Sequence, residues 1–302
     1  IINPRDKGKN LGWRDGGGAC TGAIRTTKTK TRNGGPPHSK ERSMSNHPYA
    51  RDYRTPSPMP RSLPSLRFYA RLAGILYRAG KKAAHGVYSA DDWIFSSEEV
   101  GHALESVGAD IRIEGFEHVC GLNGPCVFVA NHMSTLETFF LPCIIQPVRD
   151  VTFVVKDSLL KYPCLGPVLR SREPLVVGRA NPREDLAVVL DGGRRHLDAG
   201  RSVIIFPQGT RSGTVDEARF SSLGVKLARK AGVPVLPVAL KTDAWGTGAF
   251  IKDIGFIRPQ LPVRFLFGTP VPVTGNGKEE HAAVVDFIKK TFDGWASEDG
   301  RD

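Results

Sequence analysis

The sequence predicts an α/β fold: a mostly parallel central sheet covered by helices, with an amphipathic helix on its N-terminal side. Two patterns predict it. From about residue 107 onward, short runs of β-branched and other apolar residues alternate with longer segments of helical periodicity, as in chains that alternate strands with helices. Before that point, residues 63–87 interleave apolar and basic side chains, which predicts a helix with one apolar and one charged face.

Seven short apolar runs predict the strands. They span residues 111–113, 126–130, 152–155, 175–177, 203–206, 235–239 and 263–267. The segments between them predict helices, of which residues 182–199 form the clearest. Asn181 can cap its first turn, and Pro182 fits that turn, because neither residue needs to donate a helical hydrogen bond there. Two further helices are predicted at about residues 220–231 and 279–295.

The net charge of +11 over 302 residues is carried mainly by the N-terminal part of the chain. Residues 1–60 hold 12 Lys and Arg against 4 Asp and Glu, whereas the remaining residues hold 30 against 27. Residues 1–60 are rich in Gly, Pro and basic residues and lack periodicity, which predicts a disordered basic tail. The sequence from Met44 onward resembles that of a folded protein more than the residues before it do. Residues 1–43 are therefore hypothesised not to belong to the native protein.

Residues 61–106 are predicted to form a helical segment at a membrane surface. Apolar residues such as Phe68 and Leu72 alternate there with Arg67 and Arg71, the pattern of a helix that lies in the lipid interface. The same pattern suits a helix that packs on the protein core while its arginines reach solvent. The sequence leaves both interpretations open. No run reaches the ~18 apolar residues that a membrane-spanning helix needs.

Residues suited to catalysis gather where the apolar run 126–130 ends. Asn131 and His132 follow it at once, and Glu137 comes five positions after the histidine. In open α/β sheets, sites are built at the carboxyl ends of strands. Glu137 can fold back onto the imidazole, fix its tautomer and leave the other ring nitrogen free as a base. The alternative is a solvated or structural His–Glu pair.

A second polar stretch, Pro-Gln-Gly-Thr-Arg-Ser at residues 207–212, follows the predicted strand 203–206. Gly209 permits a close backbone approach, and backbone N–H groups in such a turn can cradle an anion. Arg211 offers a planar fork of donors for a phosphate. The alternative for this arginine is a surface ion pair.

Together these stretches resemble the motifs of the glycerolipid acyltransferase family. The four resembling segments are, in the family's order, residues 132–137, residues 156–166 with 177–179, residues 206–212 and residues 233–238. The likeness covers about residues 110–268. The second segment matches loosely, and two positions depart from the family: Glu137 stands in place of Asp, and Gln208 in place of Glu.

The resemblance implies that residues 107–302 form an acyltransferase domain with the fold of glycerol-3-phosphate acyltransferases. Such a domain moves a fatty acyl group from acyl-CoA or acyl carrier protein to the free hydroxyl of 1-acyl-sn-glycerol-3-phosphate, giving phosphatidic acid. The acyl donor would be a co-substrate, and neither a cofactor nor a metal is expected. The implied location is the cytoplasmic face of the membrane, bound peripherally or monotopically.

The resemblance also implies roles for single residues. His132 would be the catalytic base, and Glu137 would orient it and stabilise the imidazolium. The residues expected to bind the substrate phosphate are Gln208, Gly209, Thr210, Arg211 and Arg179. Because Gln208 and Glu137 depart from the family's pattern, the identity of the acceptor stays open.

Three alternatives remain at this point. One is an acyltransferase for another lyso-lipid acceptor, and the second is a catalytically silent lipid-binding protein. The third, a nucleic-acid-binding protein, is suggested by the basic tail alone, because the domain lacks a basic stripe with aromatic residues. The five cysteines form no C-x-x-C pair, which favours free thiols in a reducing compartment.

Overall fold

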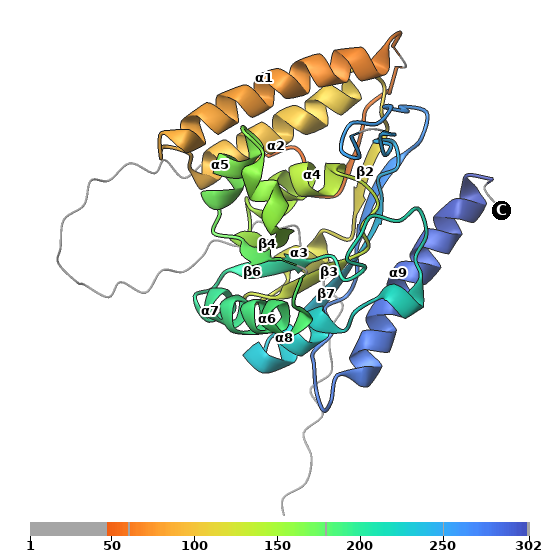
Figure 1. The fold of residues 1–302 in the computed structure, drawn as a ribbon. Helices are drawn as coiled ribbons and strands as arrows, with labels where there is room; N and C mark the ends of the chain where they lie inside the picture. Colours follow the sequence, from red (N-terminus) through yellow and green to blue (C-terminus); the bar gives the residue numbers. More distant parts are fainter. Residues whose placement is uncertain (1–46, 60, 179, 250, 301–302) are drawn as a thin grey trace, which may run out of the picture. The chain divides into compact units, whose positions relative to one another are not determined.

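A computed structural model of the 302-residue chain describes residues 47–59, 61–178, 180–249 and 251–300. An eight-stranded sheet runs through them in the order β1-β2-β8-β7-β3-β6-β4-β5 (Figure 1). The strands are β1 (Tyr53–Arg54), β2 (Ile111–Glu114), β3 (Val127–Ala130), β4 (Val151–Lys156), β5 (Leu175–Val177), β6 (Ser202–Ile205), β7 (Val235–Lys241) and β8 (Val263–Phe267). Five neighbouring pairs are parallel, whereas β1–β2 and β7–β8 are antiparallel. The predicted mostly parallel α/β sheet is therefore confirmed.

Helices connect the strands and cover the sheet. The longer ones are α1 (Pro64–Ala84), α2 (Ala90–Glu105), α4 (Leu136–Ile145), α8 (Leu223–Ala231) and α9 (Lys278–Glu298). The shorter ones are α3 (Glu117–Cys120), η2 (Asp157–Lys161), α5 (Leu165–Arg170), α6 (Pro182–Ala187), η3 (Val188–Gly192), α7 (Gly193–Asp198) and η4 (Glu217–Arg219). Within the described ranges, none of these helices is long and apolar enough to cross a membrane.

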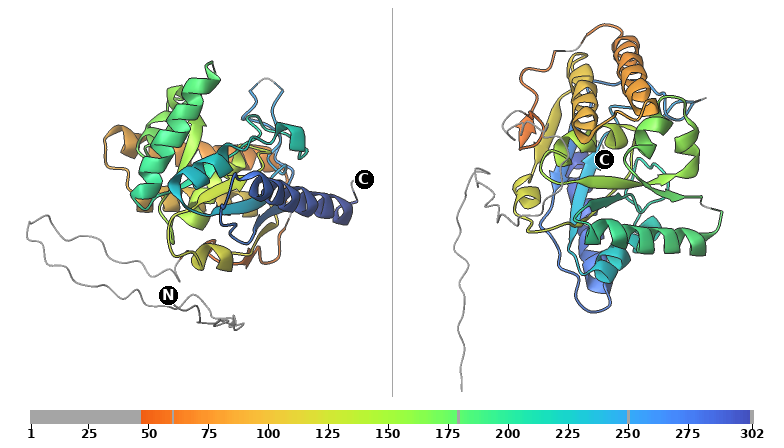
Figure 2. Two further views of the ribbon diagram at one scale, coloured as in Figure 1. Left: turned by 90° about the horizontal axis from the view of Figure 1, so that it is seen from below. Right: turned by 90° about the vertical axis from the view of Figure 1, so that its left-hand side faces the viewer.

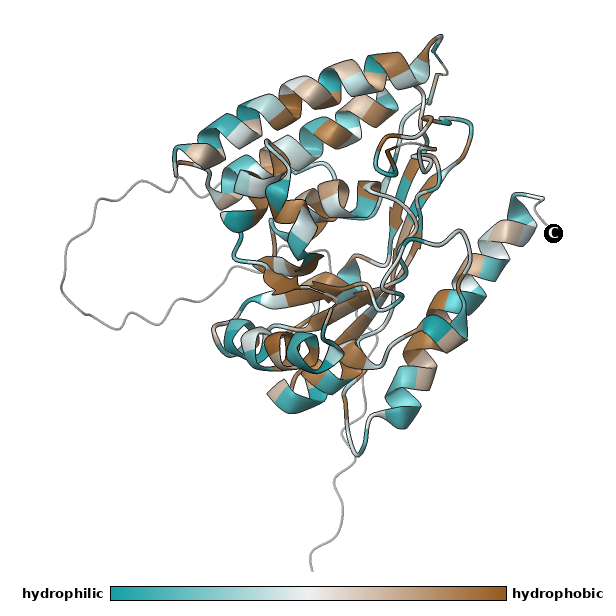
Figure 3. Ribbon diagram, in the orientation of Figure 1, coloured by the Kyte–Doolittle hydropathy of each residue, from teal (hydrophilic) through white to brown (hydrophobic). Residues whose placement is uncertain are grey.

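The central strand β3 shows how the helices are placed. All four of its residues are buried. Phe128 and Ala130 pack into a core formed with α1, α2 and α4, whereas Val127 and Val129 pack into a second core formed with α7, α8 and α9. Because successive side chains of a strand point to opposite faces, an unbroken apolar run fits a sheet that is covered on both sides. Figures 2 and 3 show these two helical layers with the apolar strands between them.

The helix predicted at residues 182–199 contains a wider turn. Between α6 and α7, the segment η3 adopts π-helical spacing. Gly192 and Gly193 lie at its end, and a Cβ on either would come within 2.6 Å of a leucine side chain. The glycines thus let the helix approach its neighbours closely. The other two predicted helices are present as α8 and α9.

Residues 47–59 correct the predicted boundary of the basic tail. Tyr49 is fully buried, and its hydroxyl donates to Oε2 of Glu105 at 2.7 Å. The hydroxyls of Tyr53 and Thr55 donate to Oε1 of the same carboxylate at 2.5 and 2.8 Å. These residues therefore belong to the fold, because a partner about 50 positions away satisfies them. The rest of the predicted tail, residues 1–46, lies outside the described residues.

Helix α1 carries two apolar stripes with the same spacing. One stripe is buried and consists of Phe68, Leu72, Ile75 and Ala79. The second is exposed and consists of Leu66, Ala70, Ala73 and Tyr77. Residues three and four positions apart share one face of a helix, so the first stripe packs α1 on the core, as one of the two interpretations predicts. The second stripe leaves an apolar face turned outward.

Candidate active site

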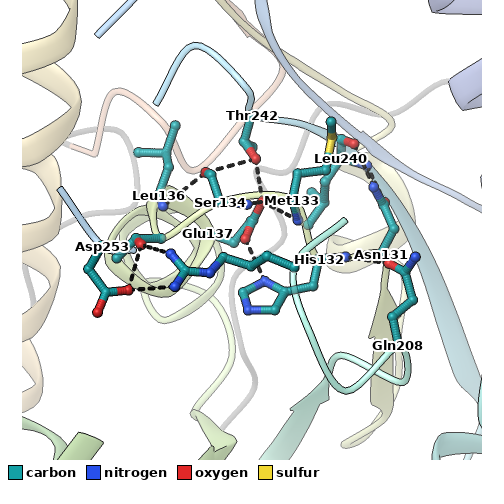
Figure 4. Close-up of polar contacts among 12 residues, drawn as sticks. Asn131, His132, Met133, Ser134, Leu136, Glu137, Gln208, Leu240, Thr242 and Asp253 are labelled. Atoms are coloured by element: carbon teal, nitrogen blue, oxygen red, sulfur yellow. Dashed lines mark hydrogen bonds and ion pairs between the residues drawn. The ribbon is translucent and has the colours of Figure 1, made fainter. Parts of the chain in front are cut away.

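The carboxyl end of β3 carries the residues that the sequence singles out (Figure 4). Asn131, directly after the strand, is buried and exchanges two hydrogen bonds with the backbone of Leu240 on β7. Its Nδ2 donates to the Leu240 carbonyl oxygen at 2.7 Å, and its Oδ1 accepts from the Leu240 N–H at 2.8 Å. This clamp between β3 and β7 fixes the point at which the next residue, His132, leaves the sheet.

His132 and Glu137 form the pair that their spacing predicts. Nδ1 of the imidazole lies 2.7 Å from Oε2 of the carboxylate. Because a carboxylate only accepts hydrogen bonds, Nδ1 carries the proton and Nε2 keeps a lone pair. The imidazole also stacks on Phe206, just after β6, with ring centroids 4.5 Å apart. Two independent contacts thus hold the ring with Nε2 as its free nitrogen.

Glu137 lies in the first turn of α4, fully buried and surrounded by donors. Its Oε1 accepts hydrogen bonds from the backbone N–H groups of Met133 and Ser134, at 3.1 and 2.9 Å, and from the Thr242 hydroxyl. These donors and the helix N-terminus compensate for burial of the charge. The longer side chain of Glu thus still reaches the imidazole where the family has Asp.

The side chain of Gln208 holds the backbone of His132 in place. Its Oε1 accepts from the backbone N–H of His132 at 2.9 Å, and its Nε2 donates to the carbonyl oxygen of Thr214 at 3.1 Å. The N–H of Ser212 in turn donates to the carbonyl oxygen of His132 at 2.8 Å. The oxygen and the nitrogen of the Gln208 side-chain amide therefore both bond to backbone groups. The loop after β6 binds His132 at the backbone N–H and at the backbone carbonyl oxygen of the histidine.

Arg211 forms an ion pair with a carboxylate of the chain itself. Its Nη2 lies 2.7 Å from Oδ1 of Asp253, and its Nη1 donates to the hydroxyl of Thr135. Asp253 accepts further hydrogen bonds from Thr135 at 3.1 Å and from Tyr162 at 3.0 Å. The bond to Asp253 raises the pKa of Tyr162. A phosphate that binds Arg211 must therefore share the guanidinium with Asp253 or displace it.

The other residues predicted to bind phosphate differ in position. Gly209 adopts the left-handed backbone region, with φ of 70°, in the turn after β6, where a side chain would be strained. Thr210 is exposed beside it. Arg179 lies outside the described residues. Of the five predicted residues, Gln208 binds the backbone of His132, Arg211 binds Thr135 in the same segment, and Gly209 lines a cavity together with His132.

Two cavities meet at His132. The first, of about 520 Å³, is called here the lysine cavity because Lys156 and Lys226 line it together with Gly209. The second, of about 620 Å³, is called the apolar cavity. Its walls come from α1, η2 with the residues after it, α4 with the residue before it, the loop after β6 and the segment after β7: Tyr69, Leu72, Ala73, Leu76, Thr135, Thr138, Phe139, Leu159, Tyr162, Pro163, Cys164, Leu165, Arg211, Trp245, Ile251, Asp253 and Ile254. His132 lines both cavities, as does Thr138 on α4.

The sequence analysis gave no role in the site to several residues that line or support it. Lys156 ends β4 at the sheet edge where β3 ends, and a charged residue after an apolar run was a usable signal. Lys226, Thr242 and Asp253 offered none, because the chain brings them in from α8 and from beyond β7. Among the residues that the structure describes, no three His, Cys, Asp or Glu side chains gather to hold a metal ion.

Comparisons with known proteins match the part of the chain that contains this site. A sequence model of the acyltransferase family matches residues 110–241. A 1-acyl-sn-glycerol-3-phosphate acyltransferase of Pseudomonas aeruginosa is 32% identical over 197 residues, which are 65% of this chain and 71% of that protein. A protein of the same name from Limnanthes alba is 30% identical over 158 residues, 51% of this chain and 54% of that one. The chain thus spans about half the length of the plant relative.

A crystal structure of known fold resembles this chain. It is the crystal structure of the 1-acyl-sn-glycerophosphate (LPA) acyltransferase PlsC from Thermotoga maritima, with a TM-score of 0.56. The similarity covers 77% of this chain and 95% of that chain, at 24% identity. At this identity the comparison supports the arrangement of the sheet and helices.

Proposed function

The chain belongs to the acyltransferase family, and from this membership we propose that it acylates 1-acyl-sn-glycerol-3-phosphate to phosphatidic acid. The acyl donor is acyl-CoA or acyl carrier protein, used as a co-substrate. The observation that carries the proposal is the His132–Glu137 pair, with Nδ1 and Oε2 2.7 Å apart at the junction of two cavities. A base in that position can serve two substrates that enter from different sides.

The reaction follows from the protonation state of the pair. Nε2 of His132 removes the proton of the acceptor hydroxyl as its oxygen attacks the thioester carbonyl. Glu137 stabilises the imidazolium that forms, as the acid does in hydrolase triads. When the tetrahedral intermediate collapses, the carbon–sulfur bond breaks and Nε2–H returns the proton to the leaving thiolate. The products are the new ester and the free thiol, and the histidine regains its starting state.

The two cavities suggest where each substrate lies. The apolar cavity has the volume and lining for an acyl chain. We propose that the phosphate of the acceptor binds near Arg211, the turn at Gly209 and Thr210, and Lys156. The support is that Lys156 and Gly209 line one cavity, Arg211 lines the other, and His132 lines both. Arg179 stays a predicted further ligand of this phosphate. Gln208 acts through the backbone of His132.

The enzyme is proposed to work from the cytoplasmic face of a membrane, where both its lipid substrate and its product reside. The exposed stripe of α1 supports this location, because its apolar residues Leu66 and Tyr77 lie beside the basic residues Arg67 and Arg78 on the helix surface. Such a helix can rest in the lipid interface, with its cations on anionic head groups.

Purified protein tested with labelled acyl donors and a panel of lyso-lipids checks the proposal. Transfer to lysophosphatidic acid, abolished in His132→Ala, is the expected result. Transfer to a different lyso-lipid alone would keep the chemistry but change the acceptor. Binding of lipids without any transfer would reject the enzyme function in favour of a silent lipid-binding protein.

A further inference from the structure

Large apolar side chains are exposed on two segments whose residues also line the apolar cavity. Three of them, Ile251, Ile254 and Phe256, lie in the segment after β7 and are 53%, 53% and 82% exposed. On the second segment, Leu63 and Leu66 at the start of α1 are each 66% exposed. Contiguous apolar exposure of this kind marks an interaction surface rather than ordinary solvent contact.

Hydrogen bonds hold these two groups side by side. The backbone N–H of Ile257 donates to the hydroxyl of Ser65 at 2.9 Å, and the hydroxyl of Tyr69 donates to the carbonyl oxygen of Gly255 at 2.6 Å. Phe256 lies between these two anchored positions, so its exposure is not the result of a loose chain. Figure 1 shows this segment, in blue, beside the orange N-terminal end of α1.

The segment is also folded tightly on itself. A Cβ on Gly255 would lie 2.0 Å from the carbonyl oxygen of Gly246, and one on Gly248 would lie 2.1 Å from that of Ile254. Such approaches are possible only for glycine. The backbone around Phe256 is therefore preformed, which lowers the ordering cost when Phe256 contacts a partner.

The cavity opens at the same place. Ile251 and Ile254 line the apolar cavity although each is about half exposed. On α1, Ala73 also belongs both to the exposed stripe and to the cavity wall. A surface that covered these residues would also cover the mouth of the cavity.

The charges around the surface match an anionic partner. Arg61, Arg67, Lys252 and Arg258 are exposed next to the apolar residues. The acidic residue among them, Asp253, is already paired with Arg211. Cations that surround exposed apolar side chains suit the surface of an anionic bilayer, with apolar groups in the acyl boundary and cations at the head groups.

We propose that Ile251, Ile254 and Phe256 form a second membrane-contact element, which inserts into an anionic bilayer beside the N-terminal end of α1, so that the apolar cavity opens directly into the lipid. This inference rests on the proposed function, since it supplies the route by which an acyl chain enters the cavity. The chain of the substrate then passes from bilayer to protein without crossing water.

Co-sedimentation of the full chain with vesicles of equal parts phosphatidylcholine and phosphatidylserine tests this element. Phe256→Ser should weaken binding roughly tenfold or more, because one buried aromatic side chain is lost. Val188→Ser is the matched control: Val188 is also exposed but lies in η3, in the helical layer on the other face of the sheet, and its replacement should leave binding unchanged. Equal binding by wild type and Phe256→Ser would overturn the proposal.

Tryptophan placed at the same sites gives an independent measurement. The added fluorescence of Phe256→Trp should shift to the blue on vesicles and be quenched by brominated lipid, whereas that of Val188→Trp should do neither. Absence of quenching at position 256 would refute insertion. Neither experiment needs turnover, so a failed acyl-transfer assay would reject the proposed function and leave the membrane contact to be judged separately. With water-soluble short-chain substrates, Phe256→Ser should keep the wild-type kcat.

Discussion

Three side chains fix the position and the tautomer of His132, the proposed base. Glu137 fixes the tautomer, Phe206 fixes the ring plane, and Gln208 fixes the backbone. The sequence predicted the His132–Glu137 pair because its members lie five positions apart, across a single bend. It did not predict Asp253 beside Arg211, because that contact joins positions more than 40 apart and Asp253 belongs to no periodic pattern.

Glu137→Asp tests how closely the site is fitted to the longer side chain. Glu137 binds His132 through Oε2 and the backbone of Met133 and Ser134 through Oε1. A side chain one methylene shorter cannot hold both sets of contacts, so kcat should drop while some activity remains. Steady-state kinetics checks this, and wild-type kcat in Glu137→Asp would mean that the turn adjusts freely.

Asp253→Asn tests the ion pair at the proposed phosphate site. The amide can still accept from Arg211 and Thr135, but the negative charge that competes with a phosphate is gone. The KM for the phosphate-bearing acceptor should fall by about fivefold, with kcat and the KM for the donor nearly unchanged. Arg211→Ala is the matched contrast and should raise the acceptor KM far more than the donor KM. If Asp253→Asn raised the acceptor KM as Arg211→Ala does, Asp253 would be a residue that positions Arg211.

Secondary-structure elements were predicted well where both faces of the element are buried. The run Val-Phe-Val-Ala of β3 is apolar throughout because both of its faces are covered, and that signal is local. The π-helical turn η3 was missed because an extra residue in one turn leaves most of the apolar periodicity intact. Residues 47–59 were missed because Glu105, the partner of Tyr49, lies far along the chain.

The two stripes of α1 should respond differently to mutation. Leu72→Ala removes a buried side chain of the core stripe and should lower the free energy of unfolding by about 2–5 kcal/mol. Leu66→Ser changes the exposed stripe and should alter stability by no more than about 0.5 kcal/mol. Urea unfolding of both variants measures the difference. Similar losses would mean that α1 has no outward apolar face.

At the scale of the whole molecule, the site depends on the sheet. The segments 131–137, 206–212 and 240–253 are distant in sequence, and they meet because β3, β6 and β7 are neighbours. Resemblance in the first two segments was visible in the sequence. The apolar cavity was not, because its walls come from α1, η2 and the chain after β7 together.

Thiol reactivity reports on this whole-molecule packing. Burial raises the pKa of Cys126 to about 12 and raises that of Cys143 as well, so both thiols should resist alkylation at neutral pH until the sheet unfolds. Cys164 is partly exposed and lines the apolar cavity, and it should react in the native protein and be protected by a bound acyl donor. Peptide mass spectrometry after timed alkylation checks both. Alkylation of Cys126 as fast as Cys164 would show that the core is open.

The claim that organises the site is that His132 and Glu137 act as one base. The most direct test is kcat for His132→Ala, Glu137→Gln and the double variant, with circular dichroism to confirm that each is folded. His132→Ala should lose about 10²–10⁴ in kcat, the usual contribution of a positioned base. The double variant should be hardly worse than His132→Ala alone, because residues that act as a unit are not additive. Losses that multiply in the double variant would show that the two residues do not work as a pair.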